Sequence, residues 1–135
     1  MRIMLDTNVL VSAFVFKGQG ILKMIDLLTE NHFIVLSSYV LDELKDVIRD
    51  KFPKKYAELD IFLTSLPFEY VYTPDILDET KYPALRDSGD LPVLASAIMA
   101  DVDILLTGDK DFAGLELDRP AILTPAQFVE QYHPR

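Results

Sequence analysis

The sequence of 135 residues contains no cysteine, only two histidines and no long apolar run. Without cysteine, the chain can form neither a disulfide nor a thiolate zinc site, and it has no cysteine nucleophile. His32 and His133 are too few and too isolated to suggest a histidine-rich metal site. No apolar stretch approaches the length of a membrane-spanning helix, which is about 20 residues. The start "MRIMLD" has an early acid, which is not typical of a signal peptide. We therefore expect a soluble, cytoplasmic protein with no membrane segment.

The chain also has few basic residues, 13 against 22 acidic ones, which gives a net charge of −9. This balance argues against a protein that coats a nucleic-acid duplex with a basic surface. It does not argue against a protein that binds phosphate groups through a divalent metal ion. High negative charge also favours solubility by itself, so charge alone leaves both interpretations open.

No repeat, low-complexity tract or Pro/Gly-rich linker divides the chain, so we predict a single domain over residues 1–135. Short β-type runs alternate with longer helical patterns. The predicted strands span residues 2–6, 32–37, 68–73, 102–107 and 120–124. Ser38 is the expected N-cap of the helix that follows the second strand. This alternation is typical of a parallel sheet covered by helices on both faces. The sequence therefore predicts an α/β three-layer sandwich around a five-stranded parallel sheet.

Four acidic residues are expected at one edge of this sheet. Asp6 ends the first strand inside "IMLDTNVLV", Asp109 follows the fourth strand, and Asp90 precedes the small-residue helix that leads to it. Glu43 lies about 40° from Val47 on a helical wheel and is thus the acid closest to the apolar side of its helix. Ligands of parallel α/β sheets bind beyond the carboxyl ends of the strands. These acids therefore define a candidate site.

Each acid also has a structural explanation of its own. Asp6 and Asp90 could cap helices, Asp109 could form an Asx turn in "TGDKD", and Glu43 could be an ordinary glutamate at the edge of a helix face. The coincidence of all four at one edge favours a functional site. Four carboxylates packed together repel one another, and a divalent cation such as Mg²⁺ or Mn²⁺ removes that cost.

Four blocks of the chain resemble the PIN-domain family. They are "MLDTNVLVSA", "LSSYVLDELKDVI", "DSGDLPVLASAIMADVDILLTGDKDF" and "ILTPAQFVE", and the resemblance runs from residue 1 to about residue 130. It is strongest to the toxin components of prokaryotic toxin–antitoxin pairs. The helix start "DLPVLASA" departs from the Ile-Ala type of the VapC-like subgroup, which suggests a sister group. The resemblance implies a five-stranded parallel sheet and an Mg²⁺- or Mn²⁺-dependent ribonuclease that hydrolyses single-stranded RNA.

The resemblance also implies roles for individual residues. The four acids of the family site fall on Asp6, Glu43, Asp90 and Asp109, which would be both catalytic and metal-binding. The supporting residues that it implies are Asn8, Thr107, Asp111 and Asp87.

Two further segments suggest partners. The segment "RDKFPKKY" offers contacts for an RNA backbone through Arg49, Lys51, Lys54 and Lys55, although a solvated helix end explains it equally well. The apolar segment 13–28 could form a groove for an antitoxin helix, or the contact of a homodimer or higher homo-oligomer.

Other classes of protein fit the sequence less well. A phosphoacceptor receiver domain needs paired acids at the end of the first strand, and a haloacid-dehalogenase phosphatase needs "D-x-D" where this chain has "DTN". The remaining alternative is a PIN-like module that binds RNA or a partner without cutting.

Overall fold

The computed structural model describes residues 1–115 and 117–133. Its five strands are β1 (Arg2–Leu5), β2 (Phe33–Ser37), β3 (Phe68–Val71), β4 (Ile104–Leu106) and β5 (Ala121–Leu123). They pair in parallel in the order β3-β2-β1-β4-β5. The predicted five-stranded parallel sheet of an α/β fold is therefore confirmed.

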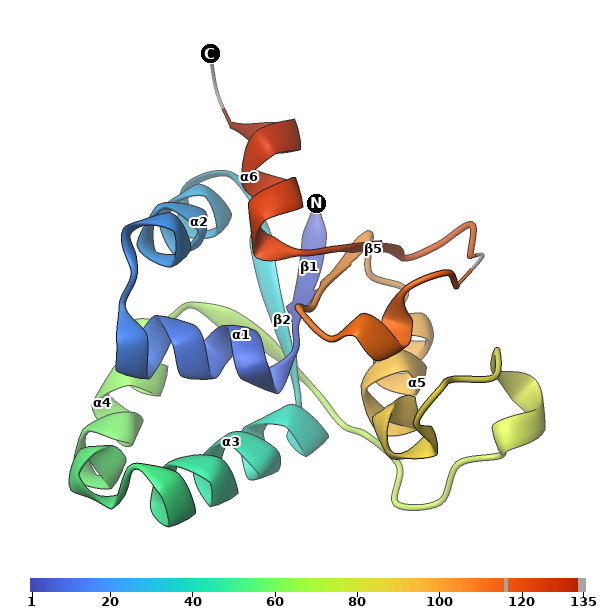
Figure 1. Cartoon of the computed structure of the whole chain (residues 1–135), viewed down its shortest axis with the longest axis horizontal. Coiled ribbons are helices and arrows are strands. Elements are labelled where there is room, and N and C mark those ends of the chain that lie inside the picture. Colours follow the sequence, from blue (N-terminus) through green and yellow to red (C-terminus); the bar gives the residue numbers. More distant parts are fainter. Residues whose placement is uncertain (116, 134–135) are drawn as a thin grey trace.

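Helices connect the strands and cover the sheet. They are α1 (Thr7–Val11), continued by the π-helical η1 (Ser12–Phe16), then α2 (Gln19–Asn31), α3 (Ser38–Lys51), α4 (Tyr56–Ser65), α5 (Leu91–Met99) and α6 (Pro125–Tyr132). In Figure 1, α1 and α2 lie on one side of β1 and β2, and α5 lies on the other. The C-terminal helix α6 returns to pack against α2.

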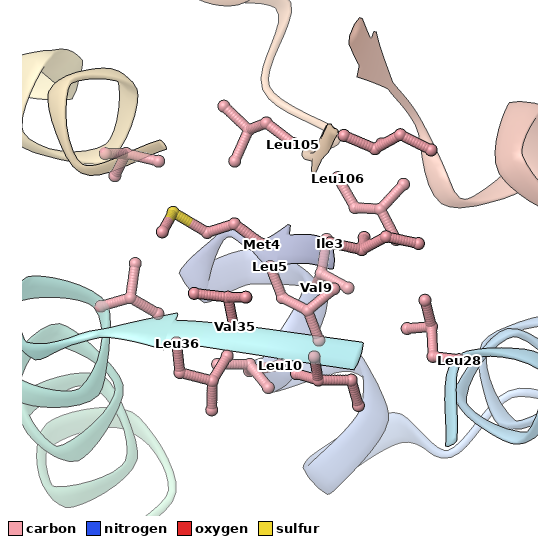
Figure 2. Close-up of a cluster of buried hydrophobic side chains, with 14 of the residues drawn as sticks. Ile3, Met4, Leu5, Val9, Leu10, Leu28, Val35, Leu36, Leu105 and Leu106 are labelled. Carbon is pink, nitrogen blue, oxygen red and sulfur yellow. The ribbon is translucent and has the colours of Figure 1, made fainter. Parts of the chain in front are cut away.

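The core is centred on β1, the middle strand of the sheet. Ile3, Met4 and Leu5 are each 0% exposed. Consecutive residues of a strand point to opposite faces, so helices must cover both faces of this strand. Figure 2 shows Met4 pointing away from Leu5 and Val9. Each fully buried side chain of this kind contributes roughly 1.5–3 kcal/mol to folding.

The strand order creates a switch point between β1 and β4. From β1 the chain moves to β2 and β3 on one side, and then crosses to β4 on the other side of β1. The helices leave the sheet in different directions at such a point, which opens a crevice beyond the carboxyl ends of the two strands. Asp6 directly follows β1, and Thr107 directly follows β4.

The start of α3 differs from the prediction by one residue. Ser37, not Ser38, is the N-cap, and its hydroxyl accepts a hydrogen bond from Val40 N at 3.2 Å. The hydroxyl of Ser38 instead accepts a bond of 2.8 Å from Thr73 N, beyond β3. Propensity alone cannot choose between two adjacent serines, because their tertiary partners decide which one caps.

Across the described ranges, no single helix is long and apolar enough to cross a membrane; only the two segments Thr7–Phe16 and Gln19–Asn31 taken together meet that test of length and composition, and they are bent by 116°.

Candidate active site

Asp6 lies at the centre of the carboxyl edge and is only 6% exposed. It is the N-cap of α1, and one carboxylate oxygen accepts a 2.7 Å hydrogen bond from Thr7 N. The other oxygen accepts a 2.7 Å bond from the hydroxyl of Thr107, which is itself buried. The predicted cap is thus present, and the β4 end also holds the side chain in place.

Burial raises the pKa of Asp6 above its ordinary value. The hydrogen bonds from Thr107 and Thr7 oppose this rise, and the negative charges of Glu43 and Asp109 add to it. Burial disfavours the charged form and hydrogen bonds to that form favour it, so burial is the stronger effect here. A nearby cation would lower the pKa again.

Asp109 is held in a turn after β4. Its backbone N–H donates to the Thr107 hydroxyl at 3.0 Å, while its own carboxylate accepts from Asp111 N at 2.9 Å. The Asx turn, which is the alternative structural explanation for Asp109, is therefore present. Because the Thr107 hydroxyl also donates to Asp6, this single group links the turn to the first strand.

Glu43 reaches the same edge from α3. One carboxylate oxygen accepts a 2.5 Å hydrogen bond from the Thr7 hydroxyl, and the other accepts from the Tyr39 hydroxyl at 3.4 Å. The buried side of α3 carries Val40 and Leu44. The neighbouring acids on this helix point outward, as the helical spacing predicts, and Glu43 alone turns toward Asp6.

Asp90 ends the short 3-10 segment η4 (Ser88–Asp90) at the start of α5. It occupies the N-cap position of α5, but its side chain makes no capping hydrogen bond. Its Oδ2 is buried and has no hydrogen-bond partner in the described structure. The capping explanation therefore does not account for this carboxylate.

Burial and several neighbouring negative charges act together on the carboxyl of Asp90. Its pKa is raised to about 7, first by burial and then by the charge of Asp109. A hydrogen bond with Asp111 and the charges of Asp87 and Asp111 raise it further. One carboxylate oxygen from each of Asp87, Asp90 and Asp111 lies within 4.8 Å of the other two.

The phenol of Tyr39 is under the electrostatic influence of three of the predicted acids. Burial raises the pKa of its phenol, and the charges of Glu43, Asp90 and Asp6 raise it further. The negative charge of Asp109 in turn raises the pKa of both Asp6 and Asp90. The four acids are therefore close enough together for their charges to interact. In the described residues none of the four forms a salt bridge.

Two further residues, which the sequence pattern does not predict, belong to this arrangement. Thr7 and Tyr39 both donate to Glu43. The spacing of Tyr39, four residues before Glu43 on one helix, is a signal that could have found it. By contrast, the side chain of Asn8 is exposed, and the hydrogen bonds to Asp6 come from Thr7 and Thr107.

The predicted basic residues lie apart from the acids. Arg49 and Lys51 are in the last turn of α3, and Lys54 and Lys55 follow in the 3-10 segment η2 (Pro53–Lys55). Lys51 is eight residues beyond Glu43, about 12 Å along the helix. The guanidinium of Arg49 pairs with the exposed Asp46 and Asp50, so part of its charge is already neutralised within the chain.

The donor set of this edge fits a hard divalent cation. It consists of carboxylate oxygens supported by hydroxyl groups, which are the ligands that Mg²⁺ and Mn²⁺ prefer. The unpartnered oxygen of Asp90 and its neighbours Asp87 and Asp111 are the kind of group that an ion would satisfy.

The fold is that of an open parallel α/β protein, a class in which ligands bind beyond the carboxyl ends of the strands at the switch point, where these acids lie. The PIN-domain family model matches residues 2–111, and the chain belongs to this family, which places it among the nucleases. The resemblance stated from the sequence is thereby confirmed.

A solved structure supports the same conclusion. The chain is similar to one in the crystal structure of VapBC2 from Rickettsia felis bound to a DNA fragment from their promoter. The two are 25% identical with a TM-score of 0.67, over 91% of this chain and 97% of the other. No curated protein sequence matches the chain.

Proposed function

We propose that this protein is a divalent-metal-dependent endoribonuclease that hydrolyses phosphodiester bonds of single-stranded RNA. The observation that carries this proposal is the gathering of Asp6, Glu43, Asp90 and Asp109 from four different elements, with no salt bridge to any of them among the described residues. Membership of a nuclease family supports the reaction class.

In this proposal Asp6 and Asp90 hold the principal Mg²⁺ or Mn²⁺ ion, and Glu43 and Asp109 complete the site. When bound, such an ion activates a water molecule and neutralises charge on the phosphate. Asp111 and Asp87 are auxiliary acids beside Asp90.

The supporting groups of the chain orient these acids. The Thr107 hydroxyl donates to one oxygen of Asp6, and Thr7 N donates to the other, which limits the rotation of the carboxylate. Thr7 and Tyr39 hold Glu43 in the same way. Hydrogen bonds of this kind to metal-binding side chains commonly contribute 10- to 100-fold in metal affinity or activity. Asn8 is a proposed supporting residue of Asp6 at the exposed start of α1.

The biological role proposed is that of the toxin in a toxin–antitoxin pair, located in the cytoplasm. The similarity to the VapBC2 structure supports an antitoxin partner. Exposed apolar side chains could contact that partner or a second copy in a homodimer or higher homo-oligomer. They include Phe16 (67% exposed), Leu22 (44%) and Ile61 (72%).

The decisive experiment is cleavage of end-labelled single-stranded RNA by the purified chain with EDTA, Mg²⁺ or Mn²⁺. We expect cleavage only with metal, and little cleavage of a duplex of the same sequence. Asp60→Asn, an exposed site on α4, is the matched control for Asp6→Asn. Equal cleavage by wild type and Asp6→Asn would overturn the proposal.

The alternative function is a PIN-like module that binds RNA or a partner without cutting. It predicts RNA binding in EDTA that metal does not convert into cleavage. Co-expression with the product of a neighbouring open reading frame tests the toxin role separately, because a true antitoxin should co-purify and inhibit cleavage.

A further inference from the structure

A cavity of about 440 Å³ lies beside the acidic edge, on the far side of Tyr39. It is formed by the start of α3, the segment that follows β3 and the start of α5. Its volume is in the range of small-ligand sites in proteins. Tyr39 connects the cavity to the acidic edge, because it lines the cavity and its hydroxyl donates a hydrogen bond of 3.4 Å to Glu43.

Two more tyrosines line the cavity from the edge strand. Tyr70 is in β3 and Tyr72 follows it, and their side chains are 56% and 63% exposed. Residues two apart in an extended chain point to the same side. Neither ring stacks on another aromatic ring within the described parts of the chain. Two aromatic faces are thus available to a ligand.

The polar groups of the cavity favour a base over a phosphate. Its charged lining residues are Lys45, Asp42 and Asp75, which together carry a net negative charge. A phosphate would be repelled, whereas carboxylates accept hydrogen bonds from the amino groups of nucleobases. Unstacked bases of single-stranded RNA commonly bind by stacking on tyrosine rings.

The frame of the cavity is held by hydrogen bonds among three elements. Thr73 N donates to the Ser38 hydroxyl at 2.8 Å, and the Thr73 hydroxyl lies 2.7 Å from that of Ser96 in α5. Tyr39 N also donates to the Thr73 hydroxyl, at 3.4 Å. These bonds hold the segment after β3 against α3, which carries Glu43, and against α5, which Asp90 directly precedes.

We infer that this cavity is a stacking subsite for one nucleobase of single-stranded RNA, next to the nucleotide whose phosphate meets the acids. The inference rests on the proposed nuclease function and adds to it a place where the substrate is held. Tyr72 and Tyr70 supply the stacking faces, and Asp42 and Asp75 favour bases with amino groups.

The test uses single-stranded RNA oligonucleotides in which one nucleotide at a time is abasic. With wild type, we expect one position near the cleavage point where loss of the base raises KM about tenfold, with little change in kcat. Tyr72→Ala should show the same loss on intact RNA and no further loss on that abasic RNA. Tyr72→Phe should behave as wild type because it keeps the ring. Phe33→Ala, at an exposed aromatic ring at the start of β2, is the matched control.

Binding of the same oligonucleotides in EDTA, measured by fluorescence anisotropy, separates this inference from the proposed function. If wild type does not cleave but Tyr72→Ala abolishes the sensitivity of binding to the abasic position, the subsite stands and the nuclease proposal fails. If wild type cleaves RNA and the Tyr70→Ala/Tyr72→Ala double variant matches it on every oligonucleotide, the subsite is overturned. Absence of both binding and cleavage by wild type overturns both.

Discussion

Acidic residues at the two edges of the sheet have different partners. At the amino edge, acids are paired with arginines: Arg119 binds Asp101 at 2.9 Å and Asp103 at 3.1 Å, while Arg2 pairs with Glu69. At the carboxyl edge, Asp6, Glu43 and Asp109 accept hydrogen bonds from hydroxyl or amide groups, and Asp90 has a buried oxygen without a partner. None of these four acids forms a salt bridge in the described chain.

This difference distinguishes carboxylates that are neutralised within the described chain from those that we propose to bind an ion. Charges neutralised within the chain contribute to folding and leave nothing to bind. Charges that share a crevice without a cation repel one another, and that repulsion disappears when an ion from outside binds. Four predictions test this contrast, from the largest expected effect to the smallest.

Asp6→Asn should lower RNA cleavage by orders of magnitude. The variant keeps the size of the side chain and can still cap α1, because asparagine caps about as well as aspartate, but it loses a charge and a strong metal-binding oxygen. Folding should survive, and stability in EDTA should be equal or higher because one like charge leaves the cluster. Asp101→Asn at the amino edge is the control, since asparagine tolerates its positive φ of 52°. A purely structural role for Asp6 predicts unchanged cleavage.

Added Mg²⁺ or Mn²⁺ should stabilise the wild-type protein by mass action, by about 2.7 kcal/mol at one hundred times the dissociation constant. Differential scanning fluorimetry should therefore show a rise in Tm of several degrees. Asp90→Asn should show a much smaller rise, because it removes an acid from the cluster, whereas Asp101→Asn should show the full rise. Equal shifts in all three proteins would mean that the ion binds elsewhere.

The metal-free protein should lose stability as the pH rises through about 7, the raised pKa of Asp90. A carboxyl whose pKa is higher in the folded chain contributes its stability below the ordinary value of 3.8 and loses it as pH rises through the folded value. Relative to Asp90→Asn, wild type should thus be more stable near pH 5 than near pH 8. Denaturant titrations in EDTA measure the difference. Parallel pH profiles for the two proteins would contradict the assignment.

Arg119→Ala should cost about 0.2–1 kcal/mol of unfolding free energy and leave cleavage unchanged. Its side chain is 49% exposed, and exposed ion pairs contribute little because water already solvates both charges. Denaturant unfolding and the RNA assay check the two halves of this prediction. A loss of cleavage would show that the two edges are coupled.

Much of the fold follows from local patterns in the sequence. The alternation of short apolar runs with helical spacing predicts the five strands to within a few residues, and continuous apolar strands such as β1 indicate burial on both faces. The strand ends are less predictable: β4 spans Ile104–Leu106, where residues 102–107 were expected. The end of a strand depends on where its neighbouring strands stop pairing with it, and the local sequence does not show this.

The site was harder to predict from the sequence than the fold. Asp6 and Asp109 follow from the strand-end rule and Glu43 from helical periodicity. The unpartnered oxygen of Asp90 and the dual role of the Thr107 hydroxyl depend on contacts between residues far apart in the chain. Local patterns contain no information on such contacts.

The sequence by itself therefore determined the parallel α/β class and, through its motifs, the family, because periodicity and residue type are local properties. The tertiary structure alone decided which acids are neutralised and which are not. Asp103 and Asp6 are both aspartates beside a strand, but the first lies within reach of Arg119 and the second faces Glu43 and Asp109. Whether a carboxylate is structural or available to an ion depends on what the fold places opposite it, since Coulomb energy depends on distance and burial rather than on sequence position.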